Sequence, residues 1–115
     1  MTLEEAYEVT GSDYKEIMEC LGNEAMVRKY AFKFLDDDSF DKLCKATEED
    51  NREEAFRASH TIKGLATNLC FTRLREKASE LTEQLRSREE SADPVLFTNL
   101  KNAYEELVFA LRECE

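Results

Sequence analysis

Apolar residues recur at helical spacing through almost the whole of this 115-residue chain. The clearest stripe lies in the segment 94–113 and consists of Leu96, Leu100, Ala103, Tyr104, Leu107, Val108 and Leu111. This i, i+3, i+4, i+7 spacing is typical of a helix that buries one face. The chain has only three glycines and one proline, too few for the turns of an all-β domain. The sequence therefore predicts an all-α fold.

Start and stop signals divide the chain into helices. Ser12, Asn23, Asn51 and Asp93 are predicted N-caps, and Gly22 is a predicted helix stop. The predicted helices cover residues 2–9, 13–21, 24–36, 52–69, 73–88 and 94–113, and an acidic break at 36–39 leads to a further helical stretch around 40–44. We expect one domain over residues 1–115, an antiparallel up-down-up-down four-helix bundle with a short N-terminal helical extension.

Composition excludes several classes of protein. The formal net charge of −10 argues against nucleic acid or an anionic membrane as a partner. The longest apolar run, Leu107 to Leu111, is too short to span a membrane, and the acidic N-terminus lacks the apolar region of a secretion signal. The four cysteines include no CxxC pair, which predicts reduced, mostly buried thiols in a cytoplasmic protein.

The single histidine, His60, lies on an unexpected face of its helix. At about 100° per residue, the apolar face of the segment 52–69 centres on Ile62, and His60 lies roughly 160° away. The sequence therefore predicts an exposed imidazole in the middle of a helix. One histidine also excludes any metal site built from several histidines.

The neighbours of His60 suit an anionic adduct. Lys63, one turn away, supplies a cation, and Gly64 removes side-chain bulk from the same face. Glycine within a helix costs about 1 kcal/mol relative to alanine, so folding gains nothing from it there. Neutral imidazole is a competent nucleophile near pH 7, which makes a phosphoryl group the best candidate. A solvated helix face with a chance His, Lys and Gly remains the alternative.

The segment from Ala55 to Leu69 resembles the signature of histidine-containing phosphotransfer (HPt) domains, the four-helix bundles of two-component phosphorelays. Its core is His60-Thr61-Ile62-Lys63-Gly64, and the resemblance covers about residues 15–112. It implies that His60 exchanges a phosphoryl group with receiver-domain aspartates. It also implies that Lys63 contacts the phosphoryl oxygens and that Gly64 lets the receiver approach.

Further roles follow from the resemblance or from the helical wheel. In many members a Gln or Glu of the next helix orients the imidazole. Aligning this sequence to the family without gaps places Thr82 at that position, with Gln84 as the second candidate. Candidate partner contacts on the His60 face are Phe56, Arg57, Thr61 and Thr67. Phe56 could equally cover a groove between helices.

Ser59 stands where many members have alanine, and Thr67 and Cys70 stand where many have glycine. Serine and alanine are both small, so Ser59 should alter the expected site little. Thr67 lies near His60 on the wheel and could narrow the docking surface, whereas Cys70 is expected to pack at the helix end.

The resemblance also implies the partners: response-regulator receiver domains and a hybrid or sensor histidine kinase. No cofactor or metal is expected on this chain, because Mg²⁺ belongs to the receiver. The chain has no glycine-rich nucleotide loop, so we expect no kinase activity of its own. We expect a monomer.

The sequence leaves two alternative functions open and argues against a third. The chain could be the phospho-accepting domain of a chemotaxis-type histidine kinase, or a helical adaptor that only binds partners. A di-metal carboxylate bundle needs two Glu-x-x-His pairs, and this chain has one histidine, with Arg57 where the glutamate would stand.

Overall fold

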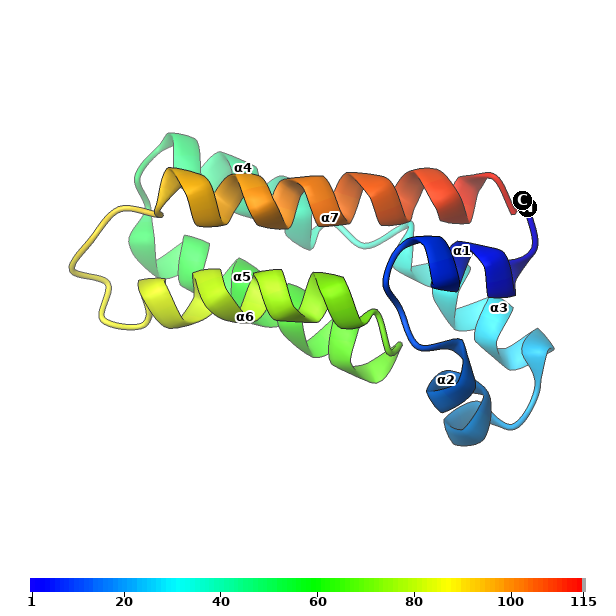
Figure 1. Ribbon diagram of the computed structural model, residues 1–115. Helices are drawn as coiled ribbons and strands as arrows, with labels where there is room; N and C mark the ends of the chain where they lie inside the picture. Colours follow the sequence, from blue (N-terminus) through cyan, green and yellow to red (C-terminus); the bar gives the residue numbers. More distant parts are fainter. Residues whose placement is uncertain (115) are drawn as a thin grey trace.

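The computed structural model describes residues 1–114, which form seven α-helices and no strand (Figure 1). The helices are α1 (Leu3–Val9), α2 (Tyr14–Leu21), α3 (Glu24–Phe34), α4 (Ser39–Glu48), α5 (Arg52–Asn68), α6 (Thr72–Leu85) and α7 (Pro94–Arg112). The predicted all-α class is therefore confirmed. The helical stretch predicted around 40–44 is longer than expected, because α4 runs from Ser39 to Glu48.

Helices α4 to α7 form an elongated bundle. The α4–α5 and α6–α7 connections lie at one end and the α5–α6 connection at the other, so consecutive helices run in opposite directions (Figure 1). Helices α3 and α4 follow one another along the same edge, separated by the predicted acidic break, while α1 and α2 cover the end that holds α3. Aromatic rings join α4 to α7, where Phe40 stacks on Tyr104 with ring centroids 4.2 Å apart.

Most predicted helix caps are present. Asn23 and Asn51 accept hydrogen bonds from the backbone N–H groups of Met26 and Glu54. Asp93 accepts from two backbone N–H groups at the start of α7, beside Pro94. Gly22 ends α2 in the left-handed conformation, with φ of 87°, which glycine adopts without steric penalty. These signals fix the end of α2 and the starts of α3, α5 and α7.

The predicted cap at Ser12 is wrong. Helix α2 begins one residue later, and the Asp13 carboxylate accepts the hydrogen bond from the Glu16 N–H at 2.9 Å. The Ser12 hydroxyl instead lies 3.1 Å from the Thr10 hydroxyl, at the end of α1. Both residue types are good caps, so composition could not decide between them.

The prediction of mostly buried cysteines is also wrong. All four thiols are free, but only Cys70 is buried, whereas Cys44 and Cys114 are half-buried and Cys20 is exposed. Cys70 packs at the α5–α6 turn, as expected. Among residues 1–114, none of the helices combines the length and the apolar composition of a membrane span.

Tyr7 anchors the N-terminal extension to the bundle. Its side chain is fully buried, and its hydroxyl donates to the Leu69 carbonyl at 2.9 Å. Burial also raises the pKa of Tyr7 well above its usual value. We expect Tyr7→Phe to lower the free energy of unfolding by about 1 kcal/mol, or the melting temperature by about 4 °C. Thermal unfolding followed by circular dichroism measures this, and an unchanged melting temperature would contradict the anchoring role.

Candidate functional site

Helix α5 has one face in the core and one face in solvent. Ile62 is 1% exposed, and Ala58, Ser59 and Ala66 are also buried, whereas His60 is exposed. The structure thus places the imidazole on the outer surface, as the helical wheel predicts. Its helix is held along the core side by α4 and α6, so His60 stands on a rigid element.

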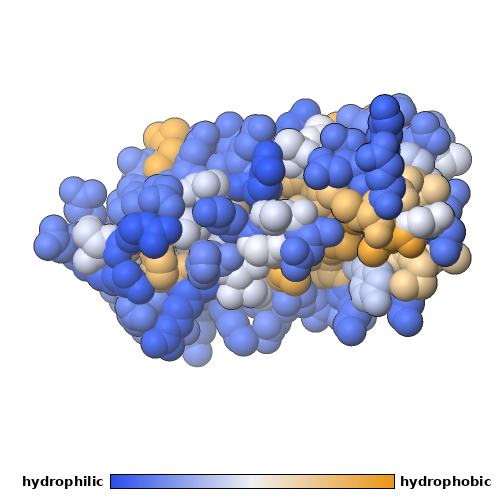
Figure 2. Space-filling model, turned by 90° about the horizontal axis from the view of Figure 1, so that it is seen from below, coloured by the Kyte–Doolittle hydropathy of each residue, from blue (hydrophilic) through white to orange (hydrophobic). Residues whose placement is uncertain are grey.

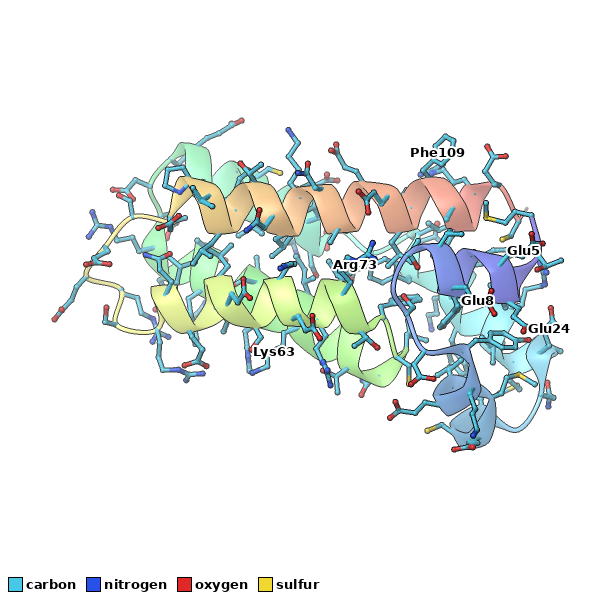
Figure 3. All side chains as sticks on the ribbon, viewed as in Figure 1. Glu5, Glu8, Glu24, Lys63, Arg73 and Phe109 are labelled. Carbon is cyan, nitrogen blue, oxygen red and sulfur yellow. The ribbon has the colours of Figure 1, made fainter. Side chains whose placement is uncertain are left out.

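Lys63 and Gly64 extend the exposed face of α5 by one turn beyond His60. The Lys63 side chain is half-buried and points away from the bundle (Figure 3). Gly64 is exposed, and a Cβ atom built on it would meet nothing within 4 Å. Packing within the chain therefore does not require glycine at this position. The backbone lies open to an approaching surface beside the imidazole.

The buried aromatic residue beneath His60 is Phe56, one helical turn earlier. Its ring is nearly parallel to the imidazole, with an interplanar angle of 10° and centroids 5.8 Å apart. The guanidinium of Arg88 lies 3.8 Å from the Phe56 ring centroid, and that of Arg86 lies 5.5 Å away. Phe56 is only 9% exposed. This burial favours the groove-covering alternative over direct contact with a partner.

The other candidate contact residues are exposed. Arg57 pairs with Glu53 and Glu54 at 3.1 Å each, so its charge is largely compensated. The hydroxyls of Thr61 and Thr67 donate to backbone carbonyls one turn earlier in α5. All three side chains lie on the surface around His60, but their polar groups already have partners within the chain.

Neither residue predicted to orient the imidazole does so through a hydrogen bond. Thr82 is fully buried, and its hydroxyl lies 2.7 Å from the Ala78 carbonyl and 3.1 Å from the Ser59 hydroxyl. Gln84 holds the α6–α7 loop, because its amide donates to the Ser91 carbonyl and accepts from the Asp93 N–H. Thr82 faces the core and Gln84 faces a loop, whereas the imidazole lies outside. The predicted orienting role is therefore not supported for either residue.

Glu83, between those two residues, lies beside the site and was not predicted. A hydrogen bond from Arg86 lowers the pKa of the Glu83 carboxyl, and the positive charge of Lys63 acts in the same direction. Arg86 donates to both carboxylate oxygens, at 2.7 and 3.1 Å. Glu83 and Arg86 thus form a compensated ion pair next to His60 and Lys63.

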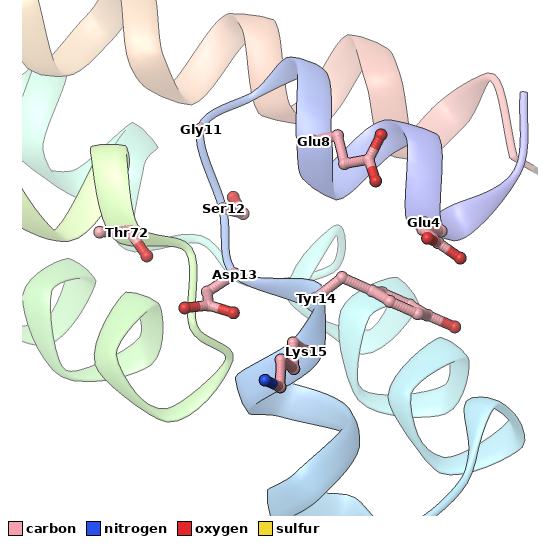
Figure 4. Close-up of a pocket in the computed structure, with 8 residues that line it drawn as sticks. All are labelled: Glu4, Glu8, Gly11, Ser12, Asp13, Tyr14, Lys15 and Thr72. Carbon is pink, nitrogen blue, oxygen red and sulfur yellow. The ribbon is translucent and has the colours of Figure 1, made fainter.

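A polar hollow of about 500 Å³ lies away from His60, between α1, α2 and the start of α6 (Figure 4). Its lining includes the carboxylates of Glu4, Glu8 and Asp13 together with Lys15 and Thr72. Within residues 1–114, no group of three His, Cys, Asp or Glu side chains is arranged to hold a metal ion. The expectation that this chain carries no metal or cofactor stays a prediction.

A second hollow, of about 310 Å³, is apolar and adjoins the exposed face of α5. It is lined by Leu21, Tyr30, Leu65, Asn68 and Leu69. Figure 2 shows the side of the molecule toward which Lys63 points, with an apolar area over the end that holds α2 and α3. Asn68, which lines this groove, follows Gly64 by one helical turn on the exposed face of α5, so the groove adjoins the surroundings of His60.

Comparison with known proteins identifies the family. The model of the Hpt domain family matches residues 34–110, from the end of α3 through most of α7. This match covers more than half of the 115 residues and includes His60, Lys63 and Gly64. No curated protein and no solved structure shows a significant match. The chain therefore belongs to the Hpt domain family.

Proposed function

We propose that this chain is a phosphorelay intermediate in which His60 accepts a phosphoryl group from one receiver aspartate and passes it to another. The family carries phosphoryl groups on histidine in phosphorelays and has no intrinsic kinase activity. The observation that carries the assignment to His60 is its exposure on α5, the helix that also presents Lys63 and the open backbone of Gly64. No other histidine exists in the chain.

The chemistry needs little from this chain beyond position and charge. The Nε2 lone pair of neutral His60 attacks the phosphorus of the aspartyl phosphate in line, so an N–P bond forms while the P–O bond to the aspartate breaks. The aspartate leaves as a carboxylate. The Lys63 ammonium stabilises the charge of the transferred group, and Arg86 compensates the nearby Glu83 carboxylate. The receiver supplies Mg²⁺, and a second receiver reverses the step.

A transfer assay tests this function. A receiver domain phosphorylated with labelled acetyl phosphate is mixed with the chain, and the label is expected to move to His60 as an acid-labile phosphoramidate. Incubation with ATP alone is expected to leave the chain unlabelled. Labelling of the chain by ATP alone would contradict the assignment as a carrier without kinase activity.

The proposed receiver covers more than the immediate surroundings of His60. A specific protein interface buries about 800 Å² on each partner, which extends over several helical turns. From His60 the surface continues through Gly64 to the apolar groove lined by Leu21, Tyr30 and Leu65. We therefore place the apolar part of the receiver contact in this groove.

Tyr30 tests this placement, because it lines the groove while being 37% exposed. Tyr30→Ala is expected to raise the Kd for the receiver by about fivefold or more, as loss of an aromatic interface contact does. The melting temperature should change little. Phe109→Ala is the matched control, since Phe109 is 67% exposed and lies on the opposite side from Lys63 (Figure 3). Titration calorimetry would contradict the placement if both variants bound like the unchanged chain.

A further inference from the structure

We propose that Phe56, held in place by Arg88, is a positioning residue that sets the plane of the His60 imidazole. This inference rests on the proposed function of His60 and adds how the nucleophile is oriented. Within residues 1–114, no hydrogen bond is made to the imidazole, and the two polar side chains expected to orient it are engaged elsewhere. Packing must therefore orient the ring.

The stacking geometry supports this role for Phe56. The two rings come from consecutive turns of α5 and lie nearly parallel, at 10°, with centroids 5.8 Å apart. This separation is within the range of about 4.5–7 Å found for offset-stacked aromatic pairs. A flat ring one turn below the imidazole favours the imidazole orientation that is parallel to it. Because Phe56 is buried, its own ring is an immobile reference surface.

Arg88 restrains Phe56 from the α6–α7 loop. Its guanidinium lies 3.8 Å from the Phe56 ring centroid, close enough for a cation–π interaction. The same guanidinium donates to Glu53 at 2.8 Å and to the Arg86 carbonyl at 2.6 Å. Glu53, one turn before Arg57 in α5, also accepts from Arg57. The contact over Phe56 is therefore fixed by α5 and by the α6–α7 loop.

The backbone of Arg88 is unusual for its residue type. Its φ is 59°, in the left-handed region that residues other than glycine rarely adopt. Such strained positions persist only where the surroundings determine them, and they often occur at functional sites. Here the left-handed turn just after α6 places the guanidinium over Phe56. The strained backbone at Arg88 therefore holds its guanidinium against Phe56, the residue that stacks on His60.

Ring orientation matters because the Nε2 lone pair lies in the plane of the imidazole. In-line attack requires that this lone pair point at the phosphorus, so the plane of the ring decides whether the encounter is productive. A misplacement of about 1 Å can reduce a rate by about 100-fold. Phe56 contributes to transfer through His60 and does not touch the phosphoryl group.

The decisive comparison is Phe56→Leu against Phe56→Tyr. Leucine fills most of the buried volume but has no flat ring, whereas tyrosine keeps the ring. We expect Phe56→Leu to slow transfer from a saturating phosphorylated receiver about tenfold, and Phe56→Tyr to restore it to within about twofold. Phe109→Leu, at an exposed aromatic residue on the far side, is the matched control and should leave the rate unchanged.

A spectroscopic readout separates positioning from general stability. In the unchanged chain the Phe56 ring current should shift the imidazole C–H proton resonances of His60 away from their free-peptide values. Phe56→Leu should return these resonances to free-peptide values, and Phe56→Tyr should retain the shift. Arg88→Ala, on a half-buried loop residue, should reduce the shift without opening the core.

The outcomes distinguish this inference from the proposed function. Unchanged transfer and unchanged imidazole resonances in Phe56→Leu would overturn the positioning role while leaving His60 as the acceptor. If Phe56→Leu does not fold, an unchanged His60 spectrum in Arg88→Ala would overturn the restraint by Arg88. If the unchanged chain accepts no phosphoryl group, the proposed function fails, and the resonances then report on the stack alone.

Discussion

Replacing His60 with glutamine is expected to abolish phosphoryl acceptance while leaving the fold intact. The imidazole is exposed and has no hydrogen-bond partner within residues 1–114, so its loss removes no buried contact except the edge of the Phe56 stack. Glutamine is a good helix former and has similar length. The melting temperature should therefore change by no more than about 2 °C, as for most surface substitutions. Transfer of label from a phosphorylated receiver should fall below detection.

The same variant tests the adaptor alternative. A protein that only binds partners would keep its activity in His60→Gln, whereas a phosphoryl carrier would lose transfer but keep receiver affinity. Receiver binding measured beside transfer, on the same preparation, separates the two. Label that persists on the variant would show that the acceptor is another residue.

Substitutions at Gly64 are expected to change stability and transfer in opposite directions. A Cβ atom at this position meets nothing within 4 Å, so Gly64→Ala should stabilise the chain by about 1 kcal/mol, or about 4 °C. Gly64→Gln should also stabilise the helix, by less. Its longer side chain would, however, stand in the path of a receiver that approaches His60. Transfer should fall by about 100-fold or more for glutamine and much less for alanine.

Two measurements on the Gly64 variants decide between packing and access. Thermal unfolding gives the stability change, and the initial rate of transfer gives the functional change. A loss of stability in Gly64→Ala would show that the glycine serves the fold. Undiminished transfer in Gly64→Gln would show that no partner approaches over this position.

The exposed histidine could be predicted because helical periodicity alone decides which face of α5 is buried. Ile62 marks the core face, and His60 lies almost opposite on any regular helix that contains both. The breaks at Gly22 and at Asp93-Pro94 were predictable for a similar reason, since each residue type has a specific role at a helix end.

The contacts around His60 were less predictable because they depend on which residues of α6 lie beside α5 and on the conformation of the α6–α7 loop. Thr82 lies four residues after Ala78 on the buried stripe of α6, and this spacing could have excluded it as a partner of an exposed imidazole. Glu83 follows it on the exposed side. Arg88 reaches Phe56 only because the loop adopts a left-handed turn at that residue, which no periodic pattern signals.

The most direct test of the central claim is to locate the phosphoryl group after transfer. The chain is mixed with a phosphorylated receiver, kept at alkaline pH to preserve phosphoramidates, and analysed by phosphorus NMR and by fragmentation mass spectrometry. The account predicts one N–P resonance and one modified residue, His60, with phosphorus bonded to Nε2. A phosphoryl group on any other residue, or none on the chain while the receiver stays phosphorylated, would contradict it.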